Sequence, residues 1–297
     1  MSMIQTRDTT QLYVKTLGDG RPVILIHGWP LSADSWDPVM MALAENGYRA
    51  IAYDRRGFGR SDQPPKGYDY DTFSDDLADV MAATGATQNA ALVGFSMGGG
   101  EIARYMSRHG GKGVSQAALI SSVVPYMLQT DDNPMGVPDS VFQNMTEGMK
   151  TNFRHFFKGF FKDFYGVGML SHPVSDEELD WAWMTTMQAG QYATLQSAAA
   201  FAYTDFRPDL AHFKVPTLVI HGTADETVPI EATAHQVVEK VPQAELIEYE
   251  GEPHAVFATQ TQRLIGDLLN FLAGRKPEER QEILDAMTAD SLAVDPL

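Results

Sequence analysis

The sequence predicts an α/β protein: a mostly parallel, twisted sheet with helices on both faces and a helical cap inserted into it. Two observations support this prediction. Short apolar runs alternate with segments of helical periodicity from residue 23 to residue 120, and the alternation returns after residue 212. Strands joined by helices form parallel sheets that are buried on both faces. With 297 residues, of which 44% are hydrophobic, the chain is long enough to bury a sizeable core.

The expected strands are short apolar runs bounded by turn residues. Residues 3–7 and 11–17 are separated by the turn residues Asp8 and Thr9, so we expect them to pair as a hairpin or meander. The buried strands are expected over residues 23–26, 49–53, 90–93, 117–120, 217–220 and 244–249.

The expected helices follow these strands. Apolar residues recur at helical spacing from Trp36 to Ala44, and Gly47 follows as the expected C-terminal cap because glycine tolerates a left-handed conformation. The other helices of the sheet region are expected over residues 73–81, 97–109, 231–241 and 261–272.

Between residues 125 and 211 the alternation stops. This segment is rich in methionine and aromatic residues, has helical periodicity without a clear strand, and begins with a polar loop over residues 129–139. We therefore expect a helical cap over residues 125–211, inserted into a core formed by residues 1–124 and 212–297. Within that core, residues 274–297 are expected to form a C-terminal extension with a charged short helix over residues 278–287 and a tail.

Composition excludes several classes of function. The net charge of −17 argues against nucleic-acid binding, which needs a basic face. The absence of cysteine excludes disulfides, thiolate catalysis and cysteine-based metal sites. No metal-binding or phosphate-binding motif occurs, so we expect neither a metal nor a cofactor. No long apolar run or signal peptide is visible, so we expect a cytoplasmic protein without membrane insertion.

A candidate nucleophile lies between an expected strand and an expected helix. The segment Gly94-Phe95-Ser96-Met97-Gly98 has the pattern G-x-S-x-G and joins the apolar run at residues 90–93 to the helix at residues 97–109. A serine on such a sharp turn is exposed as a nucleophile, and the turn needs small residues two positions away on each side. Gly94 and Gly98 meet that requirement.

A serine nucleophile needs a base and an acid that orients it. His254 comes just after the last expected strand, and Asp225 lies in the loop after the strand at residues 217–220. Both loops leave the carboxyl ends of parallel strands, where open α/β sheets bind their ligands. We therefore expect Ser96, His254 and Asp225 to form a catalytic triad, with Glu226 as the competing acid.

An oxyanion hole needs two backbone N–H donors near the nucleophile. Met97 follows Ser96 and opens a helix, and Trp29 lies in the loop after the strand at residues 23–26. We expect these two amides to be the donors; the alternative is that Trp29 only packs. Residues 54–62 are expected to be structural, with arginines and glycines that organise a tight loop beside the site.

The cap supplies candidate pocket residues. Phenylalanines recur at helical spacing from Phe153 to Phe164, which predicts either a helix that buries its aromatic face over the site or a basic amphipathic helix on a membrane. The acidic net charge favours the first interpretation. The side chains expected to line an apolar acyl or aryl pocket are Trp29, Phe156, Phe160, Trp181, Trp183, Val228 and Ala255.

Five motifs in order resemble the α/β-hydrolase family: residues 26–30, 53–62 and 93–99, and the loops of Asp225 and His254. The chain is most similar to the arylesterases and cofactor-free haloperoxidases, or perhydrolases, over about residues 3–272. The resemblance implies the α/β-hydrolase fold and hydrolysis of small aryl or alkyl esters through an acyl-enzyme, without a cofactor. It also implies a side reaction in which hydrogen peroxide replaces water and gives a peracid that oxidises halide.

The chain departs from that family at two places. Ala255 follows the candidate histidine where the family often has glycine, and about two dozen residues follow the last expected core helix. The second departure leaves open whether the protein forms a homo-oligomer. Other functions also stay open: the same triad would serve a C–C bond or lactone hydrolase, and the fold also occurs in non-catalytic ligand receptors. The expected partner is a small-molecule ester.

Overall fold

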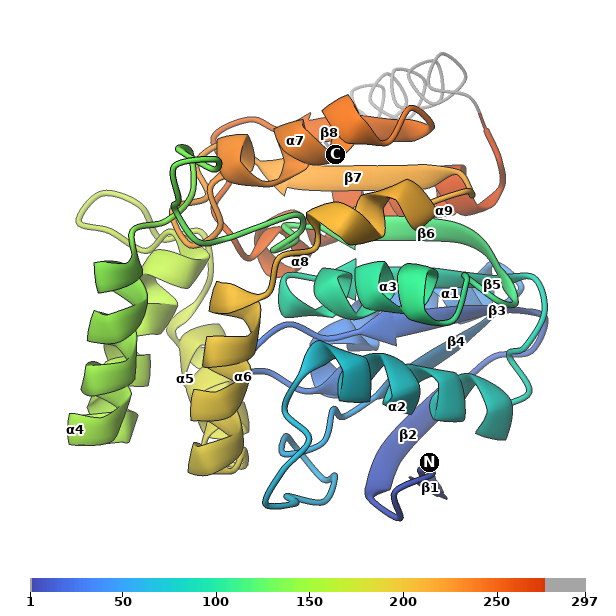
Figure 1. Ribbon diagram of the computed structural model, residues 1–297, viewed down its shortest axis with the longest axis horizontal. Helices are drawn as coiled ribbons and strands as arrows, with labels where there is room; N and C mark the ends of the chain where they lie inside the picture. Colours follow the sequence, from blue (N-terminus) through green and yellow to red (C-terminus); the bar gives the residue numbers. More distant parts are fainter. Residues whose placement is uncertain (1, 276–297) are drawn as a thin grey trace, which may run out of the picture.

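The computed structural model describes residues 2–275, so the helix and tail expected beyond residue 275 lie outside the described residues. These residues build a sheet of eight strands in the order β1-β2-β4-β3-β5-β6-β7-β8 (Figure 1). The strands are β1 Ser2–Gln5, β2 Gln11–Leu17, β3 Arg21–Ile26, β4 Tyr48–Tyr53, β5 Ala90–Phe95, β6 Val114–Ile120, β7 Thr217–Gly222 and β8 Ala244–Tyr249.

The predicted sheet is confirmed. β1 and β2 pair antiparallel, β2 pairs antiparallel with β4, and every pairing from β4 to β8 is parallel. β5 and β7 are buried along their whole length, whereas β8 at the edge of the sheet is mostly half-buried. The central strands have continuous apolar runs because helices cover them on both faces.

Helices cover the two faces of this sheet. α2 (Tyr70–Ala83) packs on α3 (Met97–Arg108), and on the opposite face α1 (Asp37–Glu45) packs on α9 (Thr261–Leu272) (Figure 1). The Asp69 side chain caps α2 by accepting the N–H of Thr72, which satisfies one of the free amides of the first turn.

The helix expected over residues 231–241 is broken near its start. A 3₁₀ turn over Ile230–Ala232 is followed by α7 (Ala234–Lys240), and Thr233 between them has φ −129° and ψ −87°. The Thr233 hydroxyl donates a hydrogen bond to the carbonyl of Pro229, 2.8 Å away. This local bond competes with helical continuation, so the periodic pattern predicted one helix where the chain forms two short pieces.

Three helices stand between β6 and β7 in the sequence, and we call them the cap: α4 (Asp139–Tyr165), α5 (Asp176–Thr186) and α6 (Gln191–Tyr203). They lie together at one side of the sheet, beyond one end of its strands (Figure 1). α4 is interrupted at Asn152, which has φ −154° and ψ 86°. The Asn152 side chain accepts the N–H of His155 and so caps a second helical segment inside α4.

Charged side chains organise the loop after β4. Arg56 donates two hydrogen bonds of 2.6 Å to the buried carboxylate of Asp76, and Arg60 donates to both oxygens of Asp54. Asp54 in turn accepts the N–H of Ala33 from the loop after β3. The loops at the carboxyl ends of β3 and β4 are therefore held together by charged side chains.

Candidate active site

Ser96 occupies a strained turn between β5 and α3. Its φ of 53° and ψ of −117° lie in a region of backbone angles that residues other than glycine rarely adopt. A Cβ at Gly94 would lie 2.6 Å from the backbone of Gly98, and a Cβ at Gly98 would lie 2.5 Å from the carbonyl oxygen of Ile26. Only glycine fits at both positions, so the pattern of the sequence has a direct steric cause here.

Ser96, His254 and Asp225 are joined in one hydrogen-bonded chain. His254 Nε2 lies 2.9 Å from Ser96 Oγ, and His254 Nδ1 lies 2.6 Å from Asp225 Oδ2. Because a carboxylate only accepts, Nδ1 carries the proton and Nε2 is left to accept the serine proton. The rings of Phe95 and Phe164 pack against the imidazole at centroid distances of 5.0 and 4.8 Å and fix its position.

The Asp225 carboxylate is buried and fully hydrogen-bonded. Oδ1 accepts the N–H groups of Thr227 and Val228 at 3.0 and 2.8 Å, Oδ2 accepts from His254, and His221 Nε2 lies 3.2 Å from the same oxygen. Burial opposes ionisation, but the two histidines outweigh it and lower the pKa of Asp225 from its ordinary value of 3.8 to about 2. The carboxylate is thus charged throughout the neutral range.

Sequence reasoning missed His221. It lies at the end of β7, fully buried; its Nε2 donates to the carbonyl of Val228 at 2.8 Å and lies 3.2 Å from Asp225 Oδ2. The signal was its position, four residues before the acid and at the same strand end. Glu226, the competing acid, is exposed and lies at the edge of the site rather than against His254.

The two expected oxyanion donors flank Ser96. Met97 is the first residue of α3, and the loop of Trp29 lies so close that a Cβ at Gly28 would be 3.1 Å from Ser96 Cβ. Within residues 2–275, neither the Trp29 nor the Met97 backbone N–H donates to another group of the protein. Buried amides without a partner are rare and indicate a site for an acceptor. The Trp29 side chain packs against Phe157, Phe160 and Phe201.

A cavity of about 450 Å³ opens above Ser96 and His254, and most of its wall is apolar. Its apolar lining consists of Trp29, Val123, Val137, Val141, Phe142, Met145, Phe156, Phe160, Phe164, Phe201 and Val228. His155, Asp163, Glu226 and Thr227 add polar groups. A pocket of this size and polarity suits a small, largely apolar ligand.

Residues 21–261 match a family model described as alpha/beta hydrolase fold. The chain belongs to the α/β-hydrolase fold family. It is 41% identical over 274 residues to Non-heme chloroperoxidase CPO-A1 of Kitasatospora aureofaciens, and the match covers 92% of this chain and 99% of that relative. It is 37% identical to Bifunctional esterase/perhydrolase DCH of Acinetobacter calcoaceticus, over 92% of this chain and 99% of the relative.

Among solved structures, the bromoperoxidase from Bacillus anthracis superposes with a TM-score of 0.88 at 39% sequence identity and covers 92% of this chain and 99% of its own. The resemblance to the α/β-hydrolase family is therefore confirmed, and the matching relatives carry the names of the predicted branch. No helix within residues 2–275 is long and apolar enough to span a membrane. Within the same residues, no cluster of three or more histidine, aspartate or glutamate side chains could hold a metal ion.

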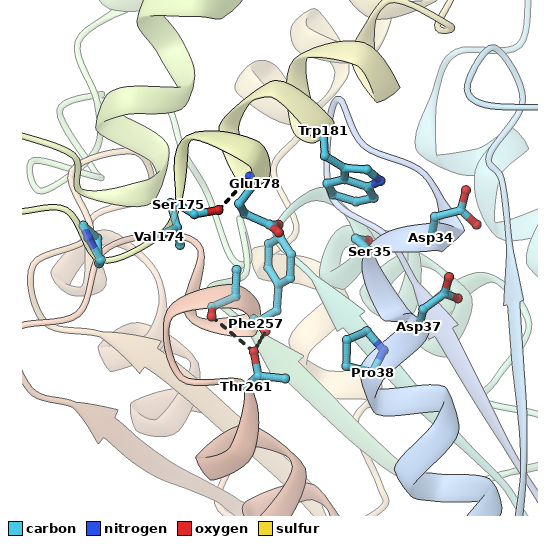
Figure 2. Close-up of a pocket in the computed structure, with 12 residues that line it drawn as sticks. Asp34, Ser35, Asp37, Pro38, Val174, Ser175, Glu178, Trp181, Phe257 and Thr261 are labelled. Carbon is cyan, nitrogen blue, oxygen red and sulfur yellow. Dashed lines mark hydrogen bonds between the residues drawn. The ribbon is translucent and has the colours of Figure 1, made fainter.

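Four of the seven expected pocket residues line the cavity: Phe156 and Phe160 from α4 of the cap, Trp29 from the loop after β3, and Val228 from the loop after β7. Trp181 lies elsewhere. Figure 2 shows its indole at a second cavity of about 560 Å³, which is lined also by Asp34 and Ser35. Trp183 faces the outer side of α4, where its Nε1 donates to the carbonyl of Arg154. Ala255 is fully buried and its N–H donates to the carbonyl of Phe164.

The reason for these misplacements is the packing of the cap helices. α5 packs on the outer side of α4, so its tryptophans do not reach Ser96. The cavity is covered instead by both halves of α4 and by Phe201 of α6. Phe142 and Met145 were missed because they precede the break at Asn152, and helical spacing alone does not predict a break. Phe157, Phe161 and Phe164 are buried inside the molecule, so the aromatic face of α4 packs internally.

Proposed function

We propose that the protein is a serine hydrolase that cleaves small carboxylic esters through an acyl-enzyme. One observation carries the proposal: the hydrogen-bonded chain from Ser96 through His254 to Asp225 opens onto an apolar cavity between two backbone amides without protein acceptors. The names of the relatives, which include an esterase/perhydrolase, support the same reaction.

In the acylation step, His254 Nε2 takes the proton of Ser96 Oγ as the oxygen attacks the ester carbonyl carbon. The carbonyl electron pair moves onto its oxygen, and the N–H groups of Trp29 and Met97 donate to this oxyanion. When the tetrahedral intermediate collapses, the bond to the alcohol oxygen breaks and His254 returns the proton to that oxygen. Asp225 stabilises the imidazolium while it carries both protons.

In the deacylation step, His254 takes a proton from water as the water oxygen attacks the carbonyl carbon of the acyl-enzyme. A second oxyanion forms in the same place, the bond to Ser96 Oγ breaks, and the proton returns to the serine. The products are the free carboxylic acid and the regenerated enzyme, so no external oxidant or cofactor enters the balance.

The cavity favours small uncharged esters. Its aromatic and aliphatic wall suits a short acyl chain or a phenyl ring, whereas the exposed carboxylates of Asp163 and Glu226 line its outer part. These charges repel an anionic substrate and also the carboxylate product, which assists product release.

Hydrolysis of an aryl acetate tests the proposal. Ser96→Ala is expected to lower kcat/KM by at least about 10⁴-fold, as the loss of a triad serine does elsewhere. Ser197→Ala is the matched control because it removes another buried serine hydroxyl, one without a hydrogen-bond partner within the described residues. A Ser96→Ala protein within about tenfold of wild type would contradict the proposal.

A second activity is favoured by the relatives named chloroperoxidase. Hydrogen peroxide in place of water would attack the acyl-enzyme and release a peracid. The peracid then transfers its terminal oxygen to a halide ion, so the halide is oxidised to hypohalous acid while the peracid is reduced to carboxylate. Bromination of a dye in acetate, peroxide and bromide is the test, and equal rates for wild type and Ser96→Ala would remove this activity.

A further inference from the structure

A buried ion pair that the proposed mechanism does not use lies beneath the site. Arg55 follows β4, Glu101 lies on α3 five residues after Ser96, and their side chains are 1% and 0% exposed. Arg55 Nε donates to one oxygen of Glu101, and the hydroxyl of Tyr53 donates to the other. Buried ion pairs add little net stability compared with apolar packing, so this pair calls for another explanation.

Arg55 extends this pair to the loop after β3. Its Nη2 donates to the carbonyl of His27 at 2.7 Å, and its backbone N–H donates to His27 Nε2 at 2.9 Å. Because Nε2 accepts, the proton of the neutral ring is on Nδ1, which donates to the carbonyl of Gly28 at 2.8 Å. Glu101, Arg55 and His27 thus form a continuous hydrogen-bonded link from α3 to Gly28.

The Gly28 carbonyl and the Trp29 N–H belong to one peptide unit, which is trans. In a planar trans peptide the two groups point in opposite directions, so an acceptor position fixed on one side orients the donor on the other. The Gly28 carbonyl is held from two directions, by His27 and by the N–H of Leu31 at 3.0 Å. The direction of the Trp29 N–H therefore follows from bonds made on the far side of its own peptide.

We propose that Glu101, Arg55 and His27 are positioning residues that orient the Trp29 N–H toward the oxyanion. They also hold this N–H in place relative to Ser96 and Met97, because Glu101 lies on the helix that begins at Met97. The proposal rests on the oxyanion role given to Trp29 above. The two donors come from segments about 70 residues apart in the chain, and α3 carries both Met97 and the carboxylate that anchors Arg55. The link therefore ties one donor directly to the element that carries the other.

The neighbouring pair Arg56–Asp76 offers a matched contrast. Arg56 and Asp76 are 1% and 3% exposed and share two hydrogen bonds of 2.6 Å, but neither side chain bonds to residues 27–29. Loss of this pair removes buried charge beside the site without breaking a hydrogen bond of the link. Asp76→Asn therefore reports what a structural defect alone does to catalysis.

Two substitutions at His27 separate the ends of the link. His27→Gln can still accept from Arg55 at the far nitrogen position but loses the donor to Gly28, whereas His27→Asn retains an N–H close to Gly28. We expect His27→Gln to lower kcat on an aryl acetate by about 10- to 100-fold with KM changed less than about threefold, because one oxyanion donor is misaligned rather than removed. His27→Asn should recover most of that kcat.

Binding of phenylboronic acid gives a second readout, because its adduct with Ser96 places an oxygen at the oxyanion position. Calorimetry should show boronate affinity falling in parallel with kcat for His27→Gln, while Asp76→Asn lowers Tm and keeps kcat and boronate affinity within about twofold.

If the His27 variants do not fold, Tyr53→Phe removes a single bond to Glu101 and Tyr249→Phe removes a comparable bond to Asp267 as its control. Tyr53→Phe alone should then lower kcat and boronate affinity together.

The inference is overturned if His27→Gln or Tyr53→Phe keeps wild-type kcat and boronate affinity, or if the controls Asp76→Asn and Tyr249→Phe lose both to the same extent. That failure is distinct from failure of the proposed function. If only the further inference fails, wild type still hydrolyses the ester through Ser96 and the link has no effect on the rate. If the proposed function fails, wild type neither hydrolyses the ester nor binds phenylboronic acid at Ser96.

Discussion

The floor and the roof of the cavity are built by different forces. The floor consists of the loops after β3, β5, β7 and β8, and its polar groups are buried and held by directional hydrogen bonds. The roof consists of α4 and α6, whose phenylalanines are held by packing. Hydrogen bonds fix atoms to within fractions of an ångström, whereas apolar packing is non-directional. Changes in the floor should therefore alter kcat, and changes in the roof should alter KM and substrate choice.

The largest effect on the floor after loss of the nucleophile is expected at Asp225. Asp225→Asn should lower kcat by about 10⁴-fold, because the amide stabilises the wrong tautomer of His254 and no longer balances the imidazolium charge. Steady-state kinetics on an aryl acetate measures this. Glu226→Gln is the matched control and should change kcat on the uncharged ester by less than about threefold, since Glu226 is exposed at the outer part of the cavity. The reverse order of effects would assign the acid to Glu226.

Asp225 also makes the stability of the folded protein depend on pH. Its pKa is lowered in the folded protein from 3.8 to about 2, so the unfolded state binds the proton more tightly. Its contribution to stability is fully present above about pH 4 and is lost as the pH falls toward 2. Asp225→Asn should accordingly flatten the fall of Tm between these pH values, and an unchanged profile would contradict the buried, ionised carboxylate.

The sequence predicted the floor well because short motifs determine it. Gly94 and Gly98 leave no room for a side chain, so the pattern around Ser96 specifies the strand-to-helix turn. His254 and Asp225 could be placed because the loops at the carboxyl ends of parallel strands lie side by side in this fold. The link from Glu101 through Arg55 to His27 was not predicted, because its members are far apart in sequence and meet only after the sheet has formed.

The roof was predicted only in part. Helical spacing identified Phe156 and Phe160, because one face of a helix is set by its own periodicity. It could not tell which side of α4 the next helix would cover, so Trp181 and Trp183 were placed at the cavity although α5 packs on the outer side of α4. The break at Asn152 brings Phe142 and Met145 to the cavity, and nothing in the apolar pattern indicates that break.

A matched pair of aromatic truncations sharpens this contrast. Phe160→Ala should raise KM for a phenyl ester by about tenfold while kcat changes less than about threefold, because it removes apolar contact from the cavity wall. Trp181→Ala removes a larger side chain at the second cavity and should leave KM within about twofold. Equal effects of the two substitutions would show that the helix packing of the cap differs from this description.

The smallest effect is expected at the mouth of the cavity. Asp163→Asn combined with Glu226→Gln should improve hydrolysis of a half-ester with a free carboxylate, relative to its uncharged analogue, by about three- to tenfold at low ionic strength. The gain should disappear in high salt because the charges are exposed. Asp19→Asn, an exposed acid in the loop between β2 and β3, is the control and should leave the ratio unchanged.

The acyl-enzyme itself is the most direct test of the floor as a catalytic site. p-Nitrophenyl acetate is mixed with the protein, the reaction is quenched in acid during the first turnover, and the peptides are analysed by mass spectrometry. We expect one acetyl group on the peptide that contains Ser96, formed together with a burst of nitrophenol and absent from Ser96→Ala. Hydrolysis without acetylated Ser96, or with the acetyl group on another residue, would contradict the account.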